Sequence, residues 1–214
     1  MVGLAGDRGG YRRAVSMPLP LPKLPPVSGG TTGRSAVDVL SEQHRALLEL
    51  CGRLTGGDGG LDAGQRRRVA DVVVATLSRH LSAEEQYLYP AVRAVVPGGE
   101  LLADRELAED RDLLVLLKRF DADRALAGEV AAAVRRHAEA DERELFPVLL
   151  RRAPAEDLIR LGNRIETAQE AAPTRPHPET PAQPPWNKVV DPAVAVVDKI
   201  RDVAGGRTTY AQDL

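Results

Sequence analysis

A short stretch, His80-Leu-Ser-Ala-Glu84 followed by Tyr87-Leu88-Tyr89-Pro90, organises the whole sequence because it occurs twice. The second copy is His137-Ala-Glu-Ala-Asp141, followed by Glu144-Leu145-Phe146-Pro147. In both copies an Arg precedes the His, a carboxylate lies four residues after it, and an aromatic-Pro pair lies nine and ten residues after it. The repetition indicates one internally duplicated site.

The spacing within each copy places two metal-competent side chains together. Residues four apart on a helix project from nearly the same face, with Cβ atoms about 5–6 Å apart. Each copy therefore directs an imidazole and a carboxylate at one point, as a helix does when it offers two ligands to a metal.

The apolar residues upstream and around the first copy predict two helices. The first starts at a cap formed by Ser35 and Asp38, and His44 lies in the middle of its apolar stripe. The second starts at Asp62 and carries the first copy on its inward face. We expect Pro90 to kink or end this second helix.

Two further helices are predicted downstream, over about residues 100–120 and 124–152. Asp110 occupies a position in the third apolar stripe where an apolar residue is otherwise expected, and the fourth helix carries the second copy. Four amphipathic helices joined by short loops are typical of an all-α, antiparallel up-and-down four-helix bundle.

The rest of the chain divides by composition. We expect a disordered leader over 1–33, the bundle over 34–152, an outer packing helix over 153–172, a Pro-rich linker over 173–190, and a short amphipathic helix with a tail over 191–214. Met17 is an alternative start to Met1. The last helix is too short to be stable alone, so it should dock on the bundle or on a partner protein.

Composition excludes several classes of protein. The chain has 214 residues, 43% of them hydrophobic, and a net charge of -2, which argues against a nucleic-acid or anionic-membrane partner. A single cysteine, Cys51, excludes an intrachain disulfide. No signal segment and no membrane-spanning apolar run are recognised, so we expect a cytoplasmic protein.

The four inward stripes together contain imidazoles and carboxylates that could hold metal: His44, His80, Glu84, Asp110, His137 and Asp141. Burying three carboxylates in one apolar bundle without a counter-charge would be prohibitive, and two divalent ions would balance them. Ligands without thiolate suit iron or manganese, and zinc is an alternative. A lone core His or Asp is more often hydrogen-bonded than metal-bound, but the duplicated pair favours the metal site.

Several neighbouring residues leave alternatives open. Glu144 falls near the same face as His137 and could replace Asp141 as a ligand. Tyr87 is either a phenol beside the site or a core residue, with core packing preferred. Cys51 is expected in the core, and His177 lies in the Pro-rich linker without an expected role.

The chain resembles the hemerythrin-like family, specifically the HHE cation-binding domain, over residues 35–152. That domain has a His on the first helix and His-x-x-x-Glu on the second, with the same order repeated on the third and fourth. The tail with Thr174-Arg-Pro-His-Pro178 also resembles bacterial, actinobacterial-type members. Two residues depart from the pattern: Asp110 stands where the family has His, and Asp141 stands where it has Glu.

The resemblance implies a non-heme, di-iron site that binds or senses a small ligand such as O2, NO or peroxide. If Asp110 does not reach the metal, a mononuclear or an empty site remains. One alternative is a di-iron oxidoreductase that consumes peroxide or NO, with Tyr87 or Tyr89 as a redox partner. Another is a metal-free helical interaction protein that uses its C-terminal helix.

Overall fold

The computed structural model describes residues 32–56, 60–122, 124–179 and 186–214, and these are mostly helical with no β-strand among them. The predicted leader lies outside the described residues, apart from residues 32 and 33. In the part of the chain that is described, no helix is long and apolar enough to cross a membrane.

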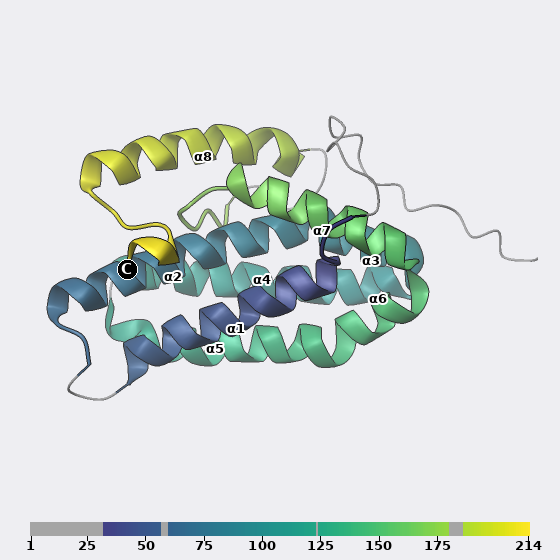
Figure 1. Ribbon diagram of the computed structural model, residues 1–214, viewed down its shortest axis with the longest axis horizontal. Coiled ribbons are helices and arrows are strands. Elements are labelled where there is room, and N and C mark those ends of the chain that lie inside the picture. Colours follow the sequence, from purple (N-terminus) through teal and green to yellow (C-terminus); the bar gives the residue numbers. More distant parts are fainter. Residues whose placement is uncertain (1–31, 57–59, 123, 180–185) are drawn as a thin grey trace, which may run out of the picture.

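Four long helices form the bundle: α1 (Ala36–Thr55), α2 (Ala63–Ala83), α4 (Gly99–Ala122) and α5 (Ala127–Ala140). Their axes run side by side in Figure 1, and short connections between successive helices give an up-and-down order. Both α1 and α4 pack against α2 and α5, so each helix has two neighbours around one core. The predicted all-α four-helix bundle is confirmed.

The first two helices begin at the predicted caps. The Ser35 hydroxyl accepts a hydrogen bond from the Asp38 N–H at 3.1 Å. At the start of α2, Asp62 accepts from the Gln65 N–H at 2.7 Å, and the Gln65 side chain accepts from the Asp62 N–H at 2.9 Å. These reciprocal bonds satisfy amide groups that the first turn of a helix leaves without partners.

Both bundle helices that carry the repeated motif contain one π-helical turn, which the periodicity did not predict. The turns are η1 (Glu84–Leu88) and η3 (Asp141–Leu145), and each begins at the carboxylate of its motif. The helices then continue as α3 (Tyr89–Val95) and α6 (Phe146–Arg152), each with its Pro in the first turn. Pro90 therefore does not end the helix, because the wider turn before it absorbs the missing N–H.

The hydrophobic core has two parts, one at each end of the bundle. The first cluster includes Leu40, Leu88, Ala103, Leu145 and Leu149, and the second includes Leu47, Leu77, Leu113, Phe120 and Val134. Along each bundle helix the change from one cluster to the other occurs around the predicted site residues. The site is thus a polar layer enclosed between two apolar layers.

Helix α7 (Ala155–Glu170) follows Pro154 as predicted and lies across α1 and α2. At Gly162 the backbone of α7 lies very close to the chain at the start of α1. A Cβ at this position would lie 2.3 Å from the Arg34 carbonyl oxygen and 2.9 Å from the Ala36 nitrogen. Only glycine lets the two backbones meet, so this contact fixes α7 on the start of α1.

Helix α8 spans Trp186–Gly205, so it begins before the expected start at Asp191. It lies alongside the bundle on the side of α2 (Figure 1). Its inward face is polar: Asp198 is fully buried beside His177, and Asp202 is buried beside Thr174 and Arg207.

The apolar side of α8 faces away from the bundle. Val197 and Ile200, which belong to the face predicted for docking, are 46% and 64% exposed, and Val203 is 84% exposed. The apolar face predicted for docking is therefore not the face that packs on the bundle, and a protein partner for this helix stays a prediction.

The Gly162 contact gives a stability prediction. The substitution Gly162→Ala should lower the free energy of unfolding by about 1–3 kcal/mol, since the new Cβ overlaps rigid backbone. Gly128→Ala is the matched control, because Gly128 lies in a helix with open space around it; it should raise stability by up to about 1 kcal/mol. Urea denaturation followed by circular dichroism measures both, and equal effects of the two substitutions would contradict the tight contact.

Candidate metal centre

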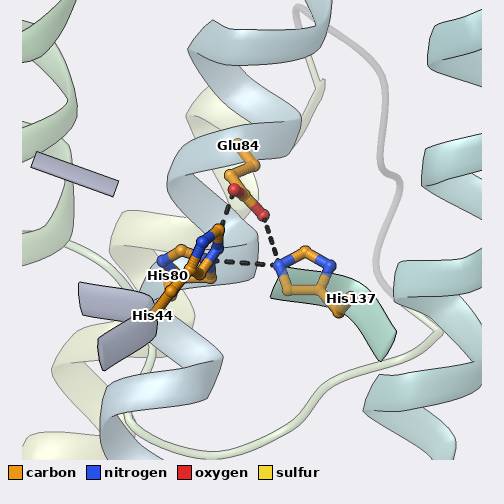
Figure 2. A group of neighbouring side chains, drawn as sticks. All are labelled: His44, His80, Glu84 and His137. Atoms are coloured by element: carbon orange, nitrogen blue, oxygen red, sulfur yellow. Dashed lines mark hydrogen bonds and ion pairs between the residues drawn. The ribbon is translucent and has the colours of Figure 1, made fainter. Parts of the chain in front are cut away.

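Three histidines from three helices meet in the polar layer. His44 comes from α1, His80 from α2 and His137 from α5, and each is at most 5% exposed. The Nε2 atom of His80 lies 3.1 Å from that of His44 and 3.1 Å from that of His137. Figure 2 shows the three rings turned toward one point, with the Glu84 carboxylate beside it.

Two carboxylates complete the cluster. Glu84, at the start of η1, has one oxygen 3.3 Å from His80 Nε2 and the other 3.4 Å from His137 Nε2 (Figure 2). Asp141, at the start of η3, has Oδ2 at 3.7 Å from His44 Nε2 and 3.8 Å from His137 Nε2. One potential ligand atom from each of His44, His80, Glu84 and His137 lies within 4.8 Å of all the others.

Each of the three histidines in the cluster has an oxygen close to its other ring nitrogen, Nδ1. His44 Nδ1 lies 3.3 Å from Glu142 Oε1, His80 Nδ1 lies 2.9 Å from Gln43 Oε1, and His137 Nδ1 lies 3.2 Å from Asp110 Oδ1. An oxygen at Nδ1 favours the tautomer with the proton on that atom, which leaves the Nε2 lone pair free. The three lone pairs then face one another.

Several of these supporting contacts were not predicted. Gln43 is held in turn by Gln169 of α7 through two amide hydrogen bonds of 2.7 and 2.8 Å. The ring of Phe146, from the second aromatic-Pro pair, stacks on His44 at 5.8 Å between centroids. The repeated aromatic-Pro pair was the one sequence signal for such contacts, and nothing in the sequence distinguished Gln43.

Six residues were predicted as metal ligands, and the structure places them in two groups. His44, His80, Glu84 and His137 form the close cluster, with Asp141 directed at it. Asp110 lies on the far side of His137, facing Nδ1 rather than Nε2. The alternative ligand Glu144 is on the surface, where it accepts a hydrogen bond from Arg105 at 2.7 Å.

The contact between Glu142 and His44 was not predicted. The Glu142 side chain is 42% exposed, and its Oε1 lies 3.3 Å from His44 Nδ1. The π turn that begins at Asp141 inserts an extra residue into the helical turn, so residues after it no longer follow the 3.6-residue period.

Burial sets the protonation preferences of the cluster. It lowers the pKa of His44 to about 3 and lowers the pKa of His80 well below its usual value. It raises the pKa of Glu84 to about 7, and burial with the nearby Glu84 raises the pKa of Asp141 well above its usual value. Burial also opposes the charged form of His137, but Glu84 and Asp110 outweigh it and raise the pKa of that residue.

The donor set fits a metal ion. Both oxygens of Glu84 and of Asp141 are buried without a hydrogen-bond partner, and leaving such groups unmatched costs about 1–3 kcal/mol each, more for charged groups. A cation bound between them would coordinate the convergent Nε2 lone pairs and compensate the charge of the carboxylate oxygens. Imidazole with carboxylate, and no thiolate, is a ligand set for iron, manganese or zinc; Cys51 is buried in the second apolar cluster.

The fold and this cluster define a helical-bundle protein with a histidine and carboxylate cation site. The model of the hemerythrin HHE cation binding domain matches residues 35–149, more than half of the chain, so the chain belongs to the hemerythrin HHE family. An uncharacterized hemerythrin-like protein, C869.06c of Schizosaccharomyces pombe (strain 972), is 24% identical over 174 residues, covering 78% of this chain and 84% of the relative. No solved structure matches the chain.

The cluster predicts which side chains are needed for metal. His80→Ala and Glu84→Ala should each abolish metal loading, because each removes a donor that no neighbour can replace. His177→Ala and Glu139→Ala are matched controls outside the cluster and should bind as much metal as the wild type. Elemental analysis of the four purified variants checks this, and undiminished metal in the first two would contradict the assignment.

Proposed function

We propose that this protein binds non-heme iron in the centre of the bundle and uses it to bind or sense a small ligand, O2, NO or peroxide. The observation that carries the proposal is the convergence of three Nε2 atoms and Glu84, with an oxygen at every Nδ1. His44, His80, His137, Glu84 and Asp141 would hold the metal. When bound, iron with such ligands and an open position supplies the affinity for these small molecules.

The chain's own residues supply a dry, enclosed site. The two apolar clusters lie above and below the polar layer and exclude water from it. Electrostatic interactions are stronger where water is excluded, so the ligands should be held tightly and small changes of charge at the metal should matter.

A surface cavity of about 530 Å³ lies between α4 and α5. Its wall includes His137, together with Leu113, Leu116, Ala133 and Arg136. Because His137 is only 5% exposed, the cavity ends at the edge of the polar layer. A diatomic molecule or peroxide is small enough to pass His137 from there, which supports a small ligand.

Iron loading tests the proposal directly. We expect the protein to retain iron after gel filtration and to show near-ultraviolet and visible absorption in air that changes when NO, azide or peroxide is added. His80→Ala treated in the same way should show no such absorption. A wild-type protein that holds no iron, or iron that responds to none of these ligands, would contradict the proposal.

Turnover separates binding from catalysis. Tyr89 is fully buried near the site, with its hydroxyl donating to Asp110 at 2.6 Å, so an oxidoreductase that consumes peroxide or NO is the second candidate function. Loss of many equivalents of peroxide or NO per iron would favour the enzyme, and stoichiometric binding would favour the binding or sensing role.

The cavity yields a prediction on rates. Ala133→Phe should slow azide association with the iron-loaded protein by about ten-fold or more, because the ring fills the space beside His137 while leaving the ligands in place. Ala132→Phe, on the exposed side of the same helix, should not change the rate. Stopped-flow absorption measures both variants, and equal rates would show that ligands enter elsewhere.

A further inference from the structure

Asp110 lies on the side of His137 that faces away from the cluster, beside Nδ1. Oδ1 lies 3.2 Å from His137 Nδ1, and Oδ2 accepts a hydrogen bond from the Tyr89 hydroxyl at 2.6 Å. Both Asp110 and Tyr89 are fully buried. The Tyr89 hydroxyl holds Oδ2, while Oδ1 lies at ion-pair distance from Nδ1 without a hydrogen bond among the described residues. Neither contact involves the Nε2 atom that faces the cluster.

The two nitrogens of an imidazole point to different sides of the ring. An oxygen that faces Nδ1 is therefore separated from an ion at Nε2 by the width of the ring. In protein metal sites such an oxygen accepts the Nδ1–H bond, fixes the tautomer and raises the basicity of the ligand. Gln43 and Glu142 occupy the corresponding positions at His80 and His44.

The spacing of the remaining donors is that of ligands to one ion. Two atoms each bound at about 2.1 Å to one ion lie about 3.0 Å apart at a right angle and about 3.4 Å apart at a tetrahedral angle. His80 Nε2 lies 3.1 Å from His44 Nε2 and 3.3 Å from Glu84 Oε1, and His137 Nε2 lies 3.4 Å from Glu84 Oε2. Among the described residues, these four form one group of close donors, and no second group of three or more is present.

A second ion would need ligands of its own, about 3.5–4 Å from the first ion. Asp110 is the α4 side chain that the sequence predicted for that role, and it faces Nδ1 of His137. Glu84 and Asp141 together carry the charge of one divalent cation, so a single ion balances the inner carboxylates.

We infer that Asp110, held by Tyr89, is a positioning residue that orients His137, and that this centre binds one metal ion where the family pattern implies two. The inference rests on the proposed metal-binding function. The inference also explains the hydroxyl of Tyr89, which holds Asp110; the counterpart of Tyr89 in the second copy is Phe146, which stacks on the His44 ring.

The test compares Asp110→Asn and Tyr89→Phe with the wild type, and Asp112→Asn, an exposed residue of the same helix, serves as the matched control. Zinc is the probe, and calorimetric titration of the metal-free proteins gives stoichiometry and affinity. We expect one zinc ion per chain in all four proteins, with affinity lowered about 10- to 100-fold in Asp110→Asn, by a smaller factor in Tyr89→Phe, and not at all in Asp112→Asn.

A second measurement separates positioning from a purely structural role. In the zinc-loaded wild type, the His137 Nδ1 proton should give a slowly exchanging downfield proton resonance, which Asp110→Asn shifts upfield and Asp112→Asn leaves in place. Circular dichroism of the metal-free Asp110→Asn protein should show that it is folded at the temperature of the titration. An unshifted resonance in the zinc-loaded Asp110→Asn protein would overturn the inference.

The stoichiometry distinguishes the failure of the inference from that of the proposed function. Two ions in the wild type and one in Asp110→Asn would identify Asp110 as a ligand and overturn the inference alone. Unchanged affinity in Asp110→Asn would overturn it as well. A wild-type protein that binds neither zinc nor iron would overturn both.

Discussion

The structure depends on the convergence of uncompensated carboxylate and imidazole groups inside an apolar bundle. Glu84, Asp110 and Asp141 are all fully buried, and the chain places no Lys or Arg in hydrogen-bond or ion-pair contact with any of them among the described residues. Such an arrangement is unfavourable unless a cation or a proton compensates the charge. The raised pKa of Glu84 has the same cause: burial without a counter-charge favours the neutral form of its carboxyl group.

The fold meets this requirement by confining polarity to one layer. Each bundle helix passes from one apolar cluster to the other, and its site residues lie at the crossing, so packing on both sides fixes their positions. The two π turns begin at Glu84 and Asp141, and the carboxylates of both residues lie inside the bundle. Helix α7 adds support from outside, since Gln169 holds Gln43 and Gln43 faces His80.

Helical period and capping residues made the bundle predictable, because apolar stripes and caps act locally. The repeated His and carboxylate spacing likewise predicted His80, Glu84, His137 and Asp141 as one group. Contacts that depend on the relative rotation of helices could not be predicted in this way. A 3.6-residue period does not account for a π turn, so the approach of Glu142 to His44 Nδ1 was not predicted. The same holds for Asp110, whose inward position was predicted correctly while the atom it faces was not.

An Asp at position 110, where the family pattern implies His, would change the chemistry of a bound metal without changing the fold. A carboxylate opposite Nδ1 makes the imidazole a stronger electron donor, and together with Glu84 and Asp141 it makes the surroundings of the metal strongly anionic. Anionic surroundings stabilise the higher charge of ferric iron over ferrous iron. If the proposed iron is bound, this charge would therefore disfavour reversible O2 carriage, which requires the ferrous state.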